Sequence, residues 1–302
     1  MKVRFKYFSF LFILTVFSYS QSKVDSFLTP SDTLNKPRRN ALLISEASLA
    51  GVTLISLNQL WYADYDRSKF HTINDNSEWM QMDKFGHLFS SYQLGRFGAD
   101  ALNWSGVSKK NQLIYGSTLG FGFLTTVEVF DGFSKEWGFS WGDILANGLG
   151  TSLYVGQELL WDEQRISVKF SFHQTKYAPQ SPDKLGKSFQ EQLLKDYNGQ
   201  TYWLSANLHS FFKESKLPKW INIAFGYGAN GMLNGSKDID NQLLTNSDRY
   251  HQYYLSFDVN LENIKTDSHF LRTILSVFNS IKVPFPTLEL SKKRCVFHLL
   301  YY

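Results

Sequence analysis

The 302 residues are enough for one large domain or two modest ones, each with a core of its own. The formal net charge is +4, and three of the 31 basic residues precede an N-terminal apolar run, so the rest of the chain is close to neutral. Nucleic-acid-binding proteins concentrate Lys and Arg, and the charge argues against that class. The single cysteine excludes an intramolecular disulfide and a thiol-rich zinc site.

Aromatic residues make up 17% of the chain, which is a high fraction. Trp and Tyr favour places where one end of the side chain is apolar and the other is wet, and membrane interfaces are such places. Soluble cores use aromatic residues too, so a fully soluble periplasmic protein is the alternative. We expect a membrane or an envelope lipid as partner and no nucleic acid, whereas the sequence identifies no protein partner.

The N-terminus has the features of a secretory signal over residues 1–20. Basic residues precede an apolar run over residues 7–17, and the small residues Ser18 and Ser20 follow it. The run is well short of the ~20 residues that an uncleaved membrane anchor needs. We therefore predict cleavage before Gln21. Because no cysteine follows the run, we expect no lipid attachment there.

After a polar lead over residues 21–40, four segments have the apolar character and length of helices. Their expected bounds are Ala41–Tyr62, Asp83–Asn103, Asn111–Phe130 and Trp141–Trp161. Gly116 and Gly120 form a Gly-x-x-x-Gly pattern, which suits close contact between helices. We expect a tight four-helix unit over residues 41–162.

From residue 163 to 302 the pattern changes to strands. Apolar and polar residues alternate, which predicts half-buried strands in the segments 166–172, 202–211, 220–229, 250–262 and 295–302. An amphipathic segment over residues 268–281 predicts a helix that covers one face of the sheet. The expected fold is α+β, with an antiparallel sheet of about five or six strands packed on helices.

Polar residues on three of the predicted helices are spaced one turn apart. These pairs are Asp83 with His87, Glu128 with Asp131, and Asp143 with Asn147. Charges placed singly in apolar helices are costly, so we expect the pairs to meet at one interior point. The candidate cluster comprises Asp83, Lys84, His87, Glu128, Asp131, Ser140, Asp143 and Asn147.

The same residues carry a family resemblance. Asp-Lys-x-x-His from Asp83, then Glu128, then Ser-x-x-Asp-x-x-x-Asn-x-x-Gly from Ser140 resembles the YfiM-like domain of unknown function. That domain occurs in predicted periplasmic lipoproteins and in longer Bacteroidota envelope proteins, and it is distantly similar to VanZ-like membrane proteins. The resemblance covers residues 40–160. It implies an envelope location and a compact helical unit, and it brings no established reaction.

Three chemical interpretations of the cluster remain open. The first is a buried polar network in which Lys84 or His87 pairs with the carboxylates and fixes the helices in register. The second is a site for a small molecule or a lipid headgroup. The third is a metal centre, with the carboxylate and imidazole ligands that suit zinc, manganese or iron, namely Asp83, His87, Glu128 and Asp143. No sequence feature identifies a cofactor.

These observations favour an exported cell-envelope protein with a non-catalytic structural or binding role at the outer membrane or its periplasmic face. The alternative is a metal- or acid/base-dependent hydrolase that acts on an envelope lipid or a cell-wall precursor. Phosphate-binding loops, dinucleotide fingerprints and nucleophile elbows are all missing from the sequence. Ser140 next to Asp143 is better explained as a helix cap than as a nucleophile.

Overall fold

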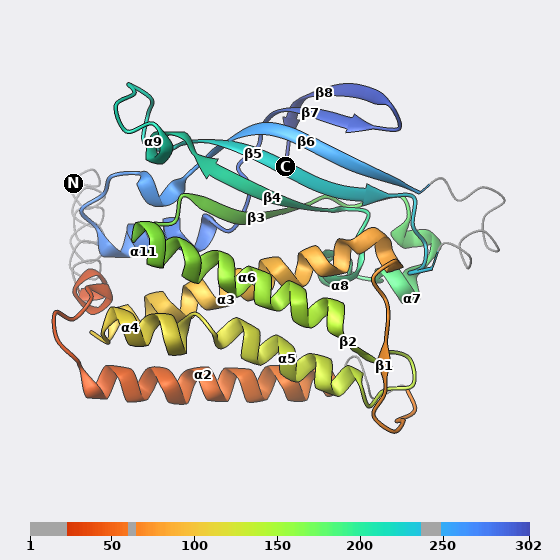
Figure 1. Cartoon of the computed structure of the whole chain (residues 1–302), viewed down its shortest axis with the longest axis horizontal. Coiled ribbons are helices and arrows are strands. Elements are labelled where there is room, and N and C mark those ends of the chain that lie inside the picture. Colours follow the sequence, from red (N-terminus) through yellow and green to blue (C-terminus); the bar gives the residue numbers. More distant parts are fainter. Residues whose placement is uncertain (1–22, 60–64, 237–248) are drawn as a thin grey trace, which may run out of the picture.

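The computed structural model describes residues 23–59, 65–236 and 249–302. Helices and a six-stranded sheet form two layers, with the sheet on one side of the helical layer (Figure 1). The predicted signal over residues 1–20 and the end of the first predicted helix, residues 60–62, lie outside the described residues. The mixed helix and sheet architecture agrees with the predicted fold class.

The helical layer is built on three long helices, to which short helices and a π-helical turn are added. The bounds are α2 Lys36–Leu57, α3 Met82–Trp104, α4 Lys109–Asn111, the π-helical turn η3 Gln112–Gly116, α5 Leu119–Asp131 and α6 Trp141–Trp161. The second and fourth predicted helices match α3 and α6 closely. The third was predicted as one helix, but η3 interrupts it before α5 begins.

Small residues allow α3 to lie close to α5 and the π-helical turn. A Cβ on Gly120 would lie 2.4 Å from the carbonyl oxygen of Ser91, and one on Gly116 would lie 2.6 Å from the backbone of Ala99. Such contacts are too short for any side chain, so glycine is required at both positions.

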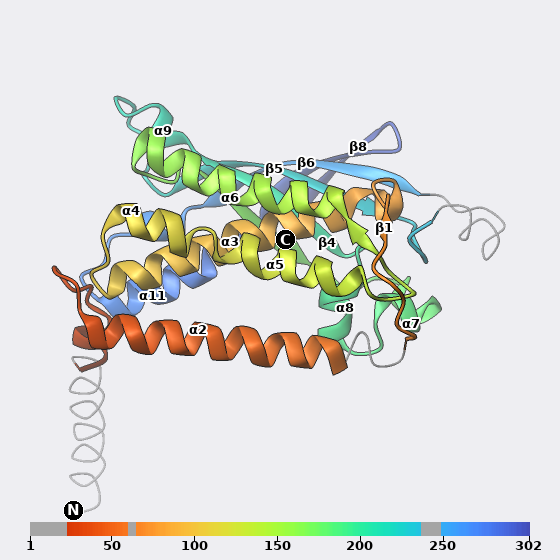
Figure 2. The same cartoon turned by 60° about the horizontal axis from the view of Figure 1, so that its bottom comes forward.

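Helix α2 differs from the prediction of a tight four-helix unit. It has no buried residue and lies along the edge of the helical layer, on the far side from the sheet (Figures 1 and 2). Within the described residues, two helical stretches, Lys36–Leu57 and Lys109–Asp131, are long and apolar enough to cross a membrane by length and composition. The tightly packed helices are therefore α3, α5 and α6, with α2 beside them.

The sheet is an antiparallel meander in which each strand pairs with the next along the chain. The strands are β3 Ile166–Phe172, β4 Gln200–Asn207, β5 Ile221–Asn230, β6 Tyr250–Val259, β7 Phe285–Ser291 and β8 Arg294–Tyr301. The sequence did not predict β7 as a strand, because Pro284 and Pro286 indicated only an extended chain. Short helices lie between the strands: η4 Ala178–Gln180, α7 Pro182–Leu185, α8 Phe189–Lys195, α9 Leu208–Phe211, η5 Leu261–Asn263 and α11 His269–Phe278.

The sheet curls so that its two outer strands approach each other. The backbone of Phe170 in β3 exchanges hydrogen bonds with Ser280 and Lys282, which lie in the segment that leads into β7. The hydroxyl of Tyr301 in β8 lies 3.2 Å from that of Thr201 in β4. The sheet therefore has a concave inner face that is closed off from solvent and a convex outer face.

In a soluble half-buried sheet the covered face is apolar and the exposed face is polar, and in this sheet the arrangement is reversed. Along β6 the inner residues are buried, and they are largely polar: Gln252, Tyr254, Ser256 and Asp258. The outer residues are apolar and roughly half exposed: Tyr253, Leu255 and Phe257. Helix α3 covers the outer face over β3, β4 and the end of β5, where Phe89 contacts Phe170 and Phe85 stacks on Tyr227. The outer face stays open over the rest of β5 and over β6 to β8.

Helix α11 also differs from the prediction that it covers the sheet. It has no fully buried residue, and its apolar residues Phe270, Leu271, Ile274, Val277 and Phe278 stay 37–53% exposed. Its firmest attachment is polar, because Arg96 of α3 donates hydrogen bonds to the hydroxyl and the carbonyl oxygen of Ser276. The helix therefore lies beside the helical layer with its apolar face uncovered.

Candidate functional site

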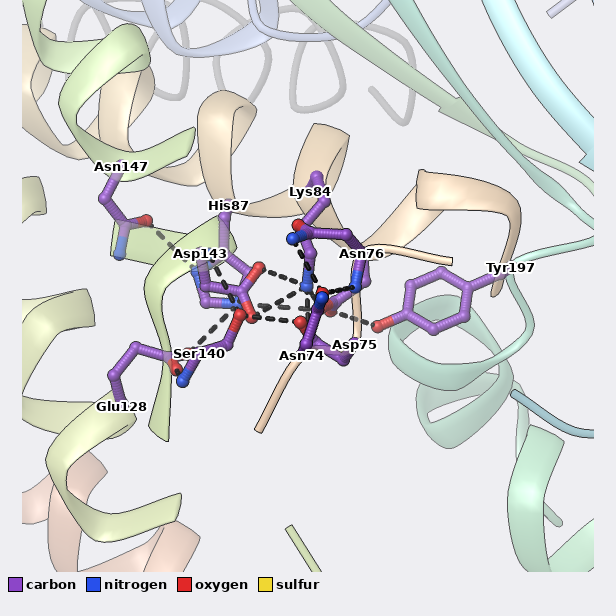
Figure 3. A network of polar contacts seen from close by, with 11 residues as sticks. Asn74, Asp75, Asn76, Lys84, His87, Glu128, Ser140, Asp143, Asn147 and Tyr197 are labelled. Atoms are coloured by element: carbon purple, nitrogen blue, oxygen red, sulfur yellow. Dashed lines mark hydrogen bonds and ion pairs between the residues drawn. The ribbon is translucent and has the colours of Figure 1, made fainter. Parts of the chain in front are cut away.

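Polar side chains from α3, α5 and α6 meet at the end of the helical layer near the short strands β1 Thr72–Ile73 and β2 Phe139–Ser140 (Figure 3). Helix α3 supplies Asp83, Lys84 and His87, and α5 supplies Glu128. Ser140 at the end of β2 and Asp143 and Asn147 of α6 complete a set of seven of the eight residues that the sequence predicted. We call this set, together with Asp75 and Tyr197, the polar cluster.

Lys84 is the central cation of the polar cluster. Its Nζ lies 2.7 Å from a carboxylate oxygen of Asp75, 2.8 Å from one of Asp143 and 3.2 Å from one of Asp83. The ammonium group has three N–H donors, and three carboxylates are available to accept them. Lys84 therefore joins the loop before α3 to α3 itself and to α6.

His87 is the second cation centre. Its Nδ1 lies 3.1 Å from the side-chain oxygen of Asn147, which can only accept, so Nδ1 carries the proton. Its Nε2 lies 3.6 Å from Glu128, 3.8 Å from Asp143 and 3.9 Å from Asp83. One ring nitrogen thus lies near three carboxylates without a close hydrogen bond to any of them.

The backbone before α3 places these side chains. Trp79, Met80 and Gln81 all have positive φ angles of 46° to 68°, a left-handed conformation that costs non-glycine residues roughly 1–2 kcal/mol each. The turn ends at Met82, whose side chain is fully buried against the sheet residues Tyr202 and Ala229. Burial of Met82 offsets the strain and fixes where α3 begins.

Ser140 connects the other elements. Its hydroxyl oxygen accepts a hydrogen bond from the backbone N–H of Asp143, which confirms the predicted helix cap. The same hydroxyl donates to Asp75, and the backbone N–H of Ser140 donates to Glu128 at 3.0 Å. Next to it, a Cβ on Gly142 would lie 2.2 Å from the side-chain oxygen of Asn76, so only glycine permits this approach.

The carboxyl groups of the polar cluster differ in the direction in which their pKa is shifted. Burial raises the pKa of Glu128 to about 8 and that of Asp143 to about 7, and in both the nearby carboxylates add to the effect. Burial acts the same way on Asp83, but the charges of His87 and Lys84 outweigh it and lower the pKa of that group. Near neutral pH, Glu128 and Asp143 are therefore poised to gain or lose a proton.

The two cations respond in the opposite direction. Burial lowers the pKa of His87, but the charges of Asp83, Asp143 and Glu128 outweigh it, so the pKa is raised. Burial also lowers the pKa of Lys84, but the charges of Asp83 and Asp143 outweigh it, so this pKa is raised too. An imidazolium beside carboxyl groups of shifted pKa is an arrangement that can exchange protons.

Three carboxylate and imidazole groups also lie close enough to bind a metal ion together. Suitable ligand atoms of Asp83, His87 and Asp143 all lie within 4.8 Å of one another. Their oxygen and nitrogen donors suit zinc, manganese or iron. Lys84 lies on oxygens of two of these groups, so its ammonium group and a metal ion would compete for them.

The structure brings together seven of the eight predicted residues. Asp131 is the exception: it acts on the polar cluster as a neighbouring charge that raises the pKa of Glu128. Sequence reasoning missed Asp75 and Tyr197, whose hydroxyl donates to Asp83 at 2.7 Å. Both lie outside the predicted helices, where no periodicity marked them.

Residues 72–157 match the model of a family described as "Predicted periplasmic lipoprotein (DUF2279)". The match includes every member of the polar cluster except Tyr197. No curated protein and no solved structure matches the chain. The family's description confirms the prediction of an exported protein of the periplasm or the cell envelope.

Proposed function

We propose that the protein is a non-catalytic structural or binding protein that contacts the lipid of the outer membrane through its apolar outer surfaces. The observation that carries this proposal is the reversed burial of the sheet. One row across β4 to β8 consists of paired apolar residues that are each 41–61% exposed, namely Leu204, Phe225, Leu255, Leu288 and Phe297. Strands that face lipid have this apolar-out, polar-in pattern.

A second apolar surface favours lipid over a protein partner. Helix α2 has exposed apolar side chains along its length, and Ile44, Leu49, Val52 and Ile55 are 61–69% exposed. It lies on the opposite side of the helical layer from the sheet (Figure 1). A dimer interface would cover one of these surfaces, whereas acyl chains cover both.

In this proposal the polar cluster has a structural role. Each carboxylate has a cation or an N–H or O–H donor nearby, and the contacts join three helices to the loop that holds Asp75. Buried polar groups that are satisfied in this way fix the register of the elements that carry them. The finer resemblance, to the longer YfiM-like envelope proteins and distantly to VanZ-like membrane proteins, fits the same role.

Vesicle flotation tests the lipid contact. The full mature chain is reconstituted with phosphatidylethanolamine and phosphatidylglycerol vesicles, and we expect it to float with them and to resist a carbonate wash. The double variant Phe225→Glu/Leu255→Glu should largely remain in the aqueous fraction. Gln190→Glu adds one negative charge at an exposed position of α8 and should float like the wild type. Recovery of the wild type in the aqueous fraction would overturn the proposal.

A second candidate function is that of a metal- or acid/base-dependent hydrolase. It is favoured by the position of His87 Nε2 among three carboxylates and by the raised pKa of Glu128 and Asp143. A metal ion held by Asp83, His87 and Asp143 would supply a Lewis acid for hydrolysis. Elemental analysis of the purified protein tests the metal-dependent form, because such a hydrolase retains about one metal ion per chain.

A further inference from the structure

A cavity of about 800 Å³ lies at the other end of α3 from the polar cluster. Its walls come from α3, α6, α11, η5 and the segment before α2. The volume is within the range of ~300–1,000 Å³ that is typical of small-molecule sites. None of the residues that line it belongs to the polar cluster, so it forms a separate feature of the fold.

Asp100 of α3 is the acidic group of this cavity that has no partner. Four carboxylates line the cavity, and three are paired: Glu262 with Arg96, Glu158 with Lys109, and Glu163 with Arg165. Within the described part of the chain, Asp100 has neither a hydrogen bond nor an ion pair. Asp100 is itself exposed at the cavity, yet desolvation by the wall around it raises its pKa to about 7.

A second polar group in the cavity wall also lacks a partner. The side chain of Tyr154 is 5% exposed, and its hydroxyl makes no hydrogen bond within the described residues. Burial and the charge of Asp100 both raise the pKa of Tyr154, so the two groups act on each other electrostatically. Tyr154 lines the cavity, so its hydroxyl is available to a ligand there.

The rest of the wall provides an apolar surface. The rings of Phe27 and Trp104 lie 5.0 Å apart, and Arg96 stacks on Phe97 with 4.4 Å between its guanidinium and the ring centroid. Across the cavity, Val277 of α11 is about half exposed. The cavity thus combines aromatic and aliphatic walls with one unpaired carboxylate.

We propose that this cavity binds an amphiphilic primary amine, whose ammonium group lies on Asp100 and Tyr154 and whose apolar part lies against Phe27, Phe97 and Trp104. The ammonium N–H groups donate to the carboxylate and to the phenolic oxygen. Among the described residues, Asp100 is the one carboxylate of the cavity without a cationic partner, whereas the guanidinium of Arg272 donates to the backbone carbonyl of Thr266. This difference favours a cation over an anion. The amine is either a free small molecule or the headgroup of an ethanolamine phospholipid.

Calorimetric titration of the full mature chain in phosphatidylcholine nanodiscs tests the proposal, with octylammonium as the probe. We expect octylammonium to bind and octanoate, which has the same chain length and the opposite charge, not to bind. Asp100→Asn should weaken octylammonium binding about tenfold or more, the usual effect of losing a charge-assisted hydrogen bond. The matched control Asp162→Asn changes an exposed aspartate of the same region and should bind like the wild type.

A second cavity variant guards against a folding defect in Asp100→Asn. Val277→Trp fills the space without removing a charge and should also weaken binding. Equal binding by the wild type and a folded Asp100→Asn variant, or equal binding of octanoate, would overturn the proposal. Nanodiscs that contain phosphatidylethanolamine distinguish the two sources: competition with octylammonium identifies the lipid headgroup, and its absence identifies a free amine.

Discussion

Lys169 of β3 and Asp258 of β6 form an ion pair of 2.8 Å on the inner face of the sheet, and neither side chain is exposed to solvent. Asp258 also accepts hydrogen bonds from the hydroxyl of Ser205 and the backbone N–H of Val283. The backbone carbonyl of Val259 accepts a further hydrogen bond from Lys169. The inner face of the sheet is therefore held by charge and hydrogen bonds where a soluble sheet would have an apolar core.

We expect Asp258→Asn to lower the free energy of unfolding by roughly 3–5 kcal/mol, because it leaves the Lys169 ammonium group buried without its counter-ion. The double variant Lys169→Met/Asp258→Asn should recover part of that loss. Urea unfolding in mild detergent measures both. As a control, Asp66→Asn removes an ion pair of equal length with Lys135 at an exposed position and should leave the unfolding midpoint unchanged.

If Asp258→Asn and Asp66→Asn changed the free energy of unfolding equally, the buried ion pair of Lys169 and Asp258 would contribute no more than an exposed one. A loss in the double variant as large as in the single variant would show instead that Asp258 acts mainly through Ser205 and Val283.

Sequence patterns predicted which residues share a face but not which face is covered. Alternation in the segment 250–262 placed Tyr253, Leu255, Phe257, Val259 and Leu261 on one face. Strand β6 confirms this as far as Val259, whereas Leu261 lies in η5. Whether another part of the chain covers such a face depends on tertiary packing. Here the covering element is α3, which is distant in the sequence. The first helix was predicted to begin at Ala41, whereas α2 begins at Lys36, and apolar composition alone did not indicate that the helix buries no residue.

The same limit applies to the polar cluster. Helical spacing predicted that His87 and Asp143 lie near one point, because a helix fixes the direction of side chains one turn apart. Asp75 reaches Lys84 only through the left-handed turn at residues 79–81, and Tyr197 arrives from the sheet region, 114 residues beyond Asp83. Loop conformation and tertiary packing leave no regular spacing in the sequence, so neither Asp75 nor Tyr197 could be predicted in the way that helical residues were.

We expect Lys84→Met to destabilise the chain by roughly 3 kcal/mol or more, because it leaves Asp75, Asp83 and Asp143 without their common counter-ion. Chemical unfolding of the mature chain measures this. Lys187→Met serves as the matched control, since Lys187 pairs with Asp183 at an exposed position. Similar midpoints for the two variants would argue against Lys84 as the centre of the polar cluster.

The same variant should gain affinity for divalent cations. Removal of the ammonium group frees oxygens of Asp83 and Asp143, which with His87 form the candidate metal-binding group. We expect Mn²⁺ or Zn²⁺ to raise the melting temperature of Lys84→Met more than that of the wild type, as binding to the folded state requires. Equal shifts in the two proteins would mean that Lys84 and the metal do not compete for these oxygens.

Asp100 should make stability depend on pH. Its pKa rises from 3.8 to about 7, mainly through burial, while Glu262 and Glu158 add to the shift and Arg96 and Lys109 oppose it. Between these values the folded chain binds more protons than the unfolded chain, so the free energy of unfolding falls as pH rises from about 4 to about 7. Because the cavity leaves the carboxyl partly in contact with water, we expect a fall of about 1–2 kcal/mol.

Comparison of Asp100→Asn with the wild type isolates this contribution. The variant should be more stable than the wild type at pH 7.5 and no more stable at pH 4.5, as measured by urea unfolding at both values. A stability difference that is the same at both values would show that Asp100 has a similar pKa in the folded and unfolded chains.

His87 decides between a structural and a functional polar cluster. Its ring donates to Asn147 and lies near Glu128, Asp143 and Asp83. If the cluster only holds the helices together, His87→Ala leaves Glu128 without a cation and leaves Asp83 and Asp143 with Lys84 alone. The free energy of unfolding should then fall by roughly 3–5 kcal/mol. His251→Ala, at an exposed position of β6, is the matched control and should have little effect. Functional sites are often built at the expense of stability. The hydrolase would therefore be favoured over the structural role by two results together: His87→Ala folds at least as stably as the wild type, and it loses a metal ion that the wild type binds.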